Sequence, residues 1–201
     1  MTFPALPCYN QPDRQYKRMM HMKLRNMTGI YLVRDREILL LYREGSRVVD
    51  HLWVPSAGGH FEPSELNDPE SCMLRELREE LGLTRDDLVD PVLRYIGIRP
   101  VGDEIRQNYY YFAGLRPECP ASLVSAEGRC RWVSLEDMHR YEMPLTAKYV
   151  TDHYRQIGRF TEELYCAVSD GSGYQFTAVH DGAAPLLTPD RPDPEKRGTS
   201  L

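Results

Sequence analysis

The sequence lacks the features that mark secreted, membrane-spanning and zinc-binding proteins. No uncharged apolar run approaches the ~20 residues that a membrane helix needs, and the N-terminus has no apolar segment of a secretory signal. The five cysteines are odd in number and widely spaced, with no Cys-x-x-Cys pair. We therefore expect reduced thiols in a cytoplasmic protein, with neither a disulfide framework nor a zinc site.

The sequence also lacks an excess of basic residues. The chain has 25 Lys and Arg against 30 Asp and Glu, which gives a formal net charge of −5. A protein that grips long nucleic acid through its phosphates needs a basic surface, so we expect neither a long nucleic acid nor a membrane as partner. A small anionic substrate remains open, because a bound metal ion can reverse the local field.

What is present is the composition of a globular protein, with 41% apolar and 27% charged residues in a chain of 201. That length fits one domain with short appendages. From composition and periodicity we expect a flexible arm at residues 1–21, a main domain at 22–158, a C-terminal hairpin extension at 159–184 and a disordered tail at 185–201.

Short β-rich runs alternate with turn residues in the main domain. The clearest helix is flanked by Asp68 as N-cap, Pro69 at the first position and Gly82 as the C-terminal stop, with an apolar stripe at helical spacing between them. We expect strands at 29–33, 37–42, 93–99, 106–113 and 130–133, an extended run at 51–55, a second helix at 146–157, and hairpin strands at 163–168 and 174–179.

The first helix gathers three carboxylates on about one turn. Glu76 shares a face with Glu79 and Glu80, because positions three and four apart are neighbours on a helix. Like charges at this spacing destabilise a bare helix by roughly 0.2–0.5 kcal/mol per pair. A divalent cation with hard oxygen ligands, such as Mg²⁺, would compensate, and the Gly58 carbonyl upstream is a further oxygen donor. The alternative is a solvated helix face with Glu–Arg pairs.

The order of these residues resembles the Nudix box, which reads Gly, five residues, Glu, seven residues, Arg-Glu-aliphatic-any-Glu-Glu-any-Gly-aliphatic. Every specified position is filled, although nine residues instead of seven separate Glu65 from Arg75. We expect the two extra residues to lengthen the loop before Asp68 and to leave the helix spacing intact. The matching residues are Gly59, Glu65, Arg75, Glu76, Leu77, Glu79, Glu80, Gly82 and Leu83.

The resemblance is to the Nudix hydrolase superfamily, in particular its MutT-like members. It implies an α/β fold, an α/β/α sandwich with a central mixed sheet, in which the box forms a loop–helix–loop. It also implies Mg²⁺, or Mn²⁺, held by Gly58, Glu76, Glu79 and Glu80. Arg75 would hold a carboxylate, most plausibly that of Glu79. The general base would be Glu76 or an acid outside the box such as Glu127.

The implied activity is hydrolysis of the diphosphate linkage of a small nucleotide. The first substrate to consider is a nucleoside triphosphate, including oxidised ones such as 8-oxo-dGTP, and the alternative is ADP-ribose or a nucleotide sugar. Segment 144–147 corresponds to the region where MutT reads the base with an Asn, and it contains no Asn. For substrate binding we expect Gly59 and His60 near the phosphates, and Trp53, Phe61 and Tyr109 as stacking surfaces.

Three other classes remain open. A non-catalytic nucleotide-binding module would share the fold, but such domains lose box acids that this chain keeps. An isomerase of the isopentenyl-diphosphate type would need a catalytic Cys, and Cys119 is the residue to test. An adaptor or a homodimer would use the hairpin at 163–179 as a pairing edge.

Overall fold

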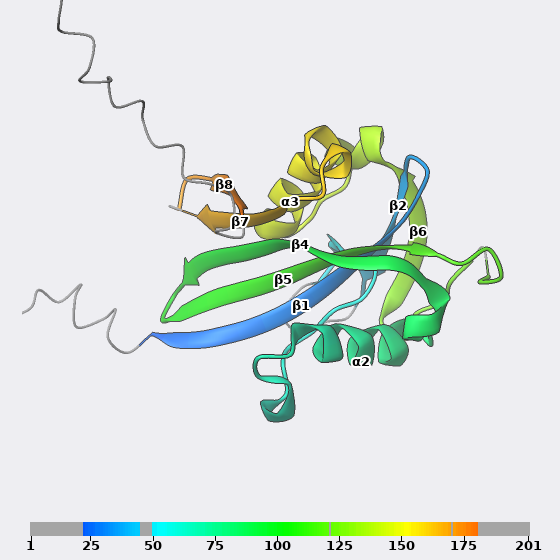
Figure 1. The fold of residues 1–201 in the computed structure, drawn as a ribbon, viewed down its shortest axis with the longest axis horizontal. Coiled ribbons are helices and arrows are strands. Elements are labelled where there is room, and N and C mark those ends of the chain that lie inside the picture. Colours follow the sequence, from blue (N-terminus) through cyan, green and yellow to red (C-terminus); the bar gives the residue numbers. More distant parts are fainter. Residues whose placement is uncertain (1–21, 45–49, 121, 170, 181–201) are drawn as a thin grey trace, which may run out of the picture.

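The computed structural model describes residues 22–44, 50–120, 122–169 and 171–180. The expected arm at 1–21 and tail at 185–201 lie outside these residues. Within them an eight-stranded sheet separates two long helices, α2 on one face and α3 on the other (Figure 1). This is the expected α/β/α sandwich. No helix in the described ranges is long and apolar enough to cross a membrane.

The expected elements all form, most of them with wider bounds. The second helix starts and ends one residue earlier than expected, the first hairpin strand starts and ends one residue later, and the extended run at 51–55 narrows to a strand at 53–54. The strands are β1 (Lys23–Arg34), β2 (Glu37–Arg43), β3 (Trp53–Val54), β4 (Leu88–Val101), β5 (Glu104–Leu115), β6 (Gly128–Ser134), β7 (Leu164–Ser169) and β8 (Tyr174–Val179). The helices are α2 (Pro69–Leu81) and α3 (Leu145–Gln156), with 3-10 turns η1 (Pro63–Glu65), η2 (Arg85–Asp87), η3 (Leu135–Arg140) and η4 (Gly158–Phe160).

The sheet is mixed, and its order is β3-β2-β1-β5-β4-β7-β8, with β6 also paired to β2. β1 runs parallel to β5, and β4 runs parallel to β7, whereas the other pairs are antiparallel. The expected hairpin is present as β7 and β8. It extends the central sheet through β4, so it is continuous with the strands that carry the site.

Two apolar layers fill the space between the sheet and the helices. Alternation along each strand sends neighbouring side chains to opposite faces. Ile30 therefore packs toward α2 with Met73 and Leu77, whereas Tyr31 packs in the layer that contains Val150 of α3. All five side chains are fully buried. These layers hold both helices at fixed positions on the sheet.

Candidate active site at helix α2

Helix α2 begins and ends where the local sequence signals place it. The Asp68 carboxylate accepts a hydrogen bond from the Ser71 backbone N–H at 3.1 Å, and Pro69 occupies the first position. At the other end Gly82 adopts a left-handed conformation with φ 68°, and its N–H bonds to the Arg78 carbonyl. These two caps fix where α2 begins and ends. Its acidic face lies against the loop at Gly58.

Arg75 organises the acidic side chains of the box. It donates to Glu65 through Nε at 2.7 Å and Nη2 at 3.1 Å, and its Nη1 donates to Glu76 at 2.8 Å and to Glu79 at 3.1 Å. The contact with Glu79 was expected, whereas the stronger, two-bond contact with Glu65 was not. Asn67, with φ 71°, lies in the lengthened loop. The two extra residues therefore leave Glu65 beside Arg75.

Two carboxylates on this face are withdrawn from water. The Glu80 side chain is 6% exposed, and burial raises its pKa to about 7, against the opposing charge of Arg43. Burial also raises the pKa of Glu76, while the Arg75 guanidinium opposes the rise. Glu79 is 54% exposed. The protein therefore holds two partly desolvated carboxylates one turn apart, at a cost that a cation would offset.

The glycine loop lies against these carboxylates. The carbonyls of Ala57 and Gly59 accept from Ile30 and Thr28 of β1, each at 2.9 Å. Gly58 lies between these two residues, and alternation along the extended backbone turns its peptide groups away from β1 and toward α2. Its N–H accordingly lies 3.3 Å from the Glu80 carboxylate.

Gly59 has no room for a side chain. A Cβ there would lie 2.3 Å from Glu76 Oε1. The close approach of this loop to α2 therefore requires glycine at this position.

This donor set fits a magnesium ion. Mg²⁺ in proteins binds one or two carboxylates and keeps waters or substrate phosphates as its other ligands. Glu76, Glu80 and the Gly58 carbonyl supply that number of oxygens. Among the described residues no three acidic, His or Cys side chains converge as a ready-made cage. The exposed side chain of Glu79 is instead paired with Arg75 at 3.1 Å.

Arg43 connects Glu127 to the same site. Its guanidinium forms an ion pair with Glu127 and lies 4.0 Å from Glu80. Pairing of β6 with β2 produces this contact, since Gly128 is the partner of Arg43 in the ladder. Glu127 thus lies near the acidic face, as expected from its place before the strand.

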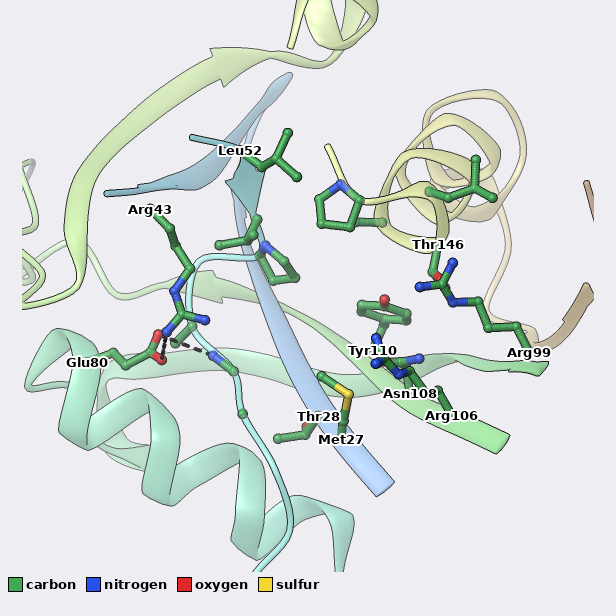
Figure 2. Close-up of a pocket in the computed structure, with 18 residues that line it drawn as sticks. Met27, Thr28, Arg43, Leu52, Glu80, Arg99, Arg106, Asn108, Tyr110 and Thr146 are labelled. Carbon is green, nitrogen blue, oxygen red and sulfur yellow. Dashed lines mark hydrogen bonds and ion pairs between the residues drawn. The ribbon is translucent and has the colours of Figure 1, made fainter. Parts of the chain in front are cut away.

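A pocket of about 290 Å³ opens from Glu80 toward the start of α3. Figure 2 shows Glu80 and Arg43 on one side and Arg99, Tyr110 and Thr146 on the other. Between them lies an apolar wall that includes Leu52, Val54, Pro55 and Leu145. The pocket therefore has an acidic end, an apolar middle and a second polar end.

Of the expected substrate-binding residues, Gly59 lines this pocket and four others lie elsewhere. Tyr109 faces α2 because alternation on β5 sends Tyr110 to the pocket instead, and Phe61 stacks on Tyr109 at 5.5 Å between ring centroids. Trp53 packs between Tyr42 and Tyr141. His60 lies in a separate surface hollow beside Arg25.

The polar residues at the second end were not anticipated from the sequence. They are Arg99, Arg106, Asn108, Tyr110 and Thr146. The one available signal was segment 144–147, which was expected near the base-binding region and does line the pocket. It carries no Asn, but Asn108 of β5 supplies an amide in the same cavity.

The fold has many relatives among solved structures. A mutator MutT protein from Bacillus halodurans superposes with a TM-score of 0.55 at 19% identity, over 77% of this chain and 97% of that one. The E. coli ORF135 protein gives 0.51 at 26% identity over 68% and 91%, and a C. elegans Ap4A hydrolase gives 0.52 at 19% over 68% and 99%. No curated protein sequence matches. The NUDIX domain model matches residues 23–154, and the chain therefore belongs to the Nudix family.

Proposed function

We propose that the chain is a Mg²⁺-dependent hydrolase that cleaves the diphosphate linkage of a nucleotide. The observation that carries the proposal is the pair of partly desolvated carboxylates, Glu76 and Glu80, one turn apart on α2, with the Gly58 backbone N–H 3.3 Å from Glu80. Membership of a family of pyrophosphohydrolases that generally use divalent metals supports it.

The residues of the site have two roles, to hold the metal ion and to position its ligands. Glu76, Glu79, Glu80 and the Gly58 carbonyl would hold the ion. When bound, Mg²⁺ would neutralise the diphosphate and polarise its phosphorus toward attack. Arg75 keeps the Glu76 carboxylate in place through its 2.8 Å hydrogen bond.

The proton of the attacking water goes to a nearby carboxylate, a step worth roughly 10²–10⁴ in rate. Glu76 and Glu127 are the two candidates for this base. Glu127 is held by Arg43 and remains 38% exposed, so water can reach it. The reaction adds water across the P–O–P bridge, and the two products each keep one of its phosphorus atoms.

The substrate is a nucleoside diphosphate linked to a further group. Because the sequence resembles MutT-like members, the first candidate is a nucleoside triphosphate, including oxidised ones such as 8-oxo-dGTP. The alternative is ADP-ribose or a nucleotide sugar. A substrate panel with 8-oxo-dGTP, normal dNTPs, ADP-ribose, nucleotide sugars and diadenosine polyphosphates, assayed with Mg²⁺ and with EDTA, tests the proposal. Magnesium-dependent hydrolysis of any member supports it.

A non-catalytic nucleotide-binding module is the rival reading. It would bind members of the panel and turn none of them over with Mg²⁺ or Mn²⁺. That result would overturn the proposed activity, because the chain would then bind nucleotides without hydrolysing them.

A further inference from the structure

We propose that the pocket end remote from Glu80 binds a phosphate monoester, so that the substrate carries a second phosphate group distant from its diphosphate. The site, which we call the remote subsite, consists of Arg99, Arg106, Asn108 and the N-terminus of α3, and all of these line the one cavity (Figure 2). The inference rests on the proposed function for the diphosphate end.

Two arginines oppose each other at the remote subsite. Arg99 of β4 and Arg106 of β5 are direct partners in the antiparallel ladder, so their side chains leave the sheet on the same face. Like charges in this position are destabilising. Glu104 forms ion pairs with Arg106 at 3.4 Å and with Arg25 at 3.1 Å. One carboxylate is thus shared by two arginines, and positive charge is left over.

Arg99 carries that unbalanced charge. Within the described residues its guanidinium forms no ion pair, and its Nε is buried without a hydrogen-bond partner. Burial raises the pKa of Tyr110 and of Tyr174, and the Arg99 charge opposes both rises; Arg99 and Tyr110 line the same cavity. Arg99 is partly buried, and a partly desolvated cation without a partner is unfavourable, so an anion from outside the protein is the expected complement.

The start of α3 adds backbone donors to the same place. Its N-cap is Pro144, which makes no side-chain cap, and the first turn holds no acidic residue. The first helical hydrogen bond runs from Lys148 N–H to the Pro144 carbonyl, so the N–H groups of residues 145–147 have no acceptor inside the helix. The N-terminus of this 12-residue helix is therefore an uncapped positive dipole end at the pocket.

Asn108 is an independent observation that points to a ligand at this end of the cavity. The residue is 9% exposed, and its side chain makes no hydrogen bond within the described part of the chain, yet it lines the cavity. Its ladder partner is Gly97, where a Cβ would lie 3.1 Å from Thr146 Cγ2. The glycine lets α3 close onto the sheet, and a bond of 2.6 Å from Thr146 to Tyr174 of β8 holds it there.

The donors favour a phosphate over an uncharged nucleobase. Guanidinium, backbone N–H and amide N–H groups all donate, and the only acidic residue lining the cavity within the described residues is Glu80, at the opposite end. A phosphate accepts several such bonds at once. A neutral base would leave the partly buried Arg99 charge without an ion pair. Among the candidate substrates, the remote subsite therefore favours those that carry a second phosphate distant from the diphosphate.

Calorimetric binding in EDTA, where no hydrolysis occurs, tests the remote subsite with two matched pairs of probes. The pairs are NADP⁺ with NAD⁺, and coenzyme A with dephospho-coenzyme A, since the members of each pair differ by one phosphate distant from the diphosphate. We expect the phosphorylated member of at least one pair to bind about tenfold tighter or better. Arg99→Gln should abolish the preference, and the exposed Arg85→Gln, which lies outside the cavity, should retain it.

Asn108→Asp provides a second variant that places a negative charge in the subsite, and it too should remove the preference. Equal binding within both pairs, undetectable binding of all four probes, or an unchanged preference in both Arg99→Gln and Asn108→Asp would overturn the proposal. Because binding is measured without metal, a retained preference in a protein that hydrolyses nothing would refute the proposed activity and leave the remote subsite standing.

Discussion

Arg75 donates two hydrogen bonds to Glu65, the acid that precedes it by ten positions in the chain. This ion pair connects the loop before α2 to the helix. It forms although this loop is two residues longer than in the family pattern. The remaining Arg75 nitrogen reaches Glu76 and Glu79. One guanidinium therefore sets the loop and two of the box carboxylates at once.

Loss of the Glu65 charge should destabilise the protein and have a recognisable pH dependence. Hydrogen bonds from Arg75 lower the pKa of Glu65 to about 2. A lowered folded-state pKa gives stability that is present above the unfolded-state value and is lost as pH falls toward 2. Glu65→Gln should therefore cost about 2 kcal/mol at pH 7 in urea unfolding, and the difference from wild type should shrink below about pH 4. A difference that stays constant with pH would contradict the ion pair.

Removal of either buried carboxylate should abolish most turnover. Glu80→Gln and Glu76→Gln are each expected to lower kcat/KM roughly a hundredfold or more, with unchanged circular dichroism, because each removes an oxygen ligand of the ion. Glu79→Gln should follow the same direction. The matched control is Glu70→Gln on the same helix, whose exposed side chain pairs with Arg85. Near-normal turnover in the Glu76, Glu79 and Glu80 variants would refute the assignment of the metal site.

A methyl group at Gly59 should disturb the site without changing any residue of helix α2. The added Cβ would lie 2.3 Å from Glu76 Oε1, so the carboxylate must move away from the loop. We expect Gly59→Ala to weaken Mg²⁺ binding about tenfold. Gly173→Ala is the control, because its Cβ would meet only Tyr149 at an ordinary 3.5 Å. Equal magnesium titration curves for the two variants would show that the Gly59 contact is unimportant.

His153 should make the packing of the hairpin on α3 sensitive to acid. Burial lowers the pKa of His153, which bonds to Tyr95 at 3.0 Å and stacks on Phe176 of β8, while the Asp152 charge opposes the shift. A lowered folded-state pKa gives stability present above about pH 6.5 and lost as pH falls through the folded value. Between pH 7.5 and 5.5 the wild-type Tm should therefore drop more than that of His153→Gln. Parallel curves would contradict this environment for the ring.

The box helix could be predicted from sequence because its signals are local. Asp68, Pro69 and Gly82 bound it in the sequence, and the spacing of Glu76 and Glu80 alone places them on one face. The remote subsite could not be predicted in this way. Arg99 and Arg106 meet only through the pairing of β4 with β5, and no local pattern reports the register of that ladder.

The aromatic residues illustrate the same limit at shorter range. A run of three tyrosines on β5 does not by itself show which of them faces the pocket, because successive residues of a strand point to opposite sides of the sheet. Tyr110 lines the pocket, whereas Tyr109 packs on the α2 side. Sequence reasoning chose Tyr109. The pocket lies on the sheet face that α3 covers, so the position of α3 is what identifies Tyr110 as the residue that lines it.

Manganese binding followed by electron paramagnetic resonance tests most directly whether the acidic face of α2 holds a cation. The wild-type protein should bind at least one Mn²⁺ ion, and Mg²⁺ should displace it. The double variant Glu76→Gln with Glu80→Gln should bind that ion at least about tenfold more weakly, while Glu70→Gln should match wild type. Equal manganese affinity in the double variant and the wild type would contradict the account, because the two buried carboxylates would then have no role in holding metal.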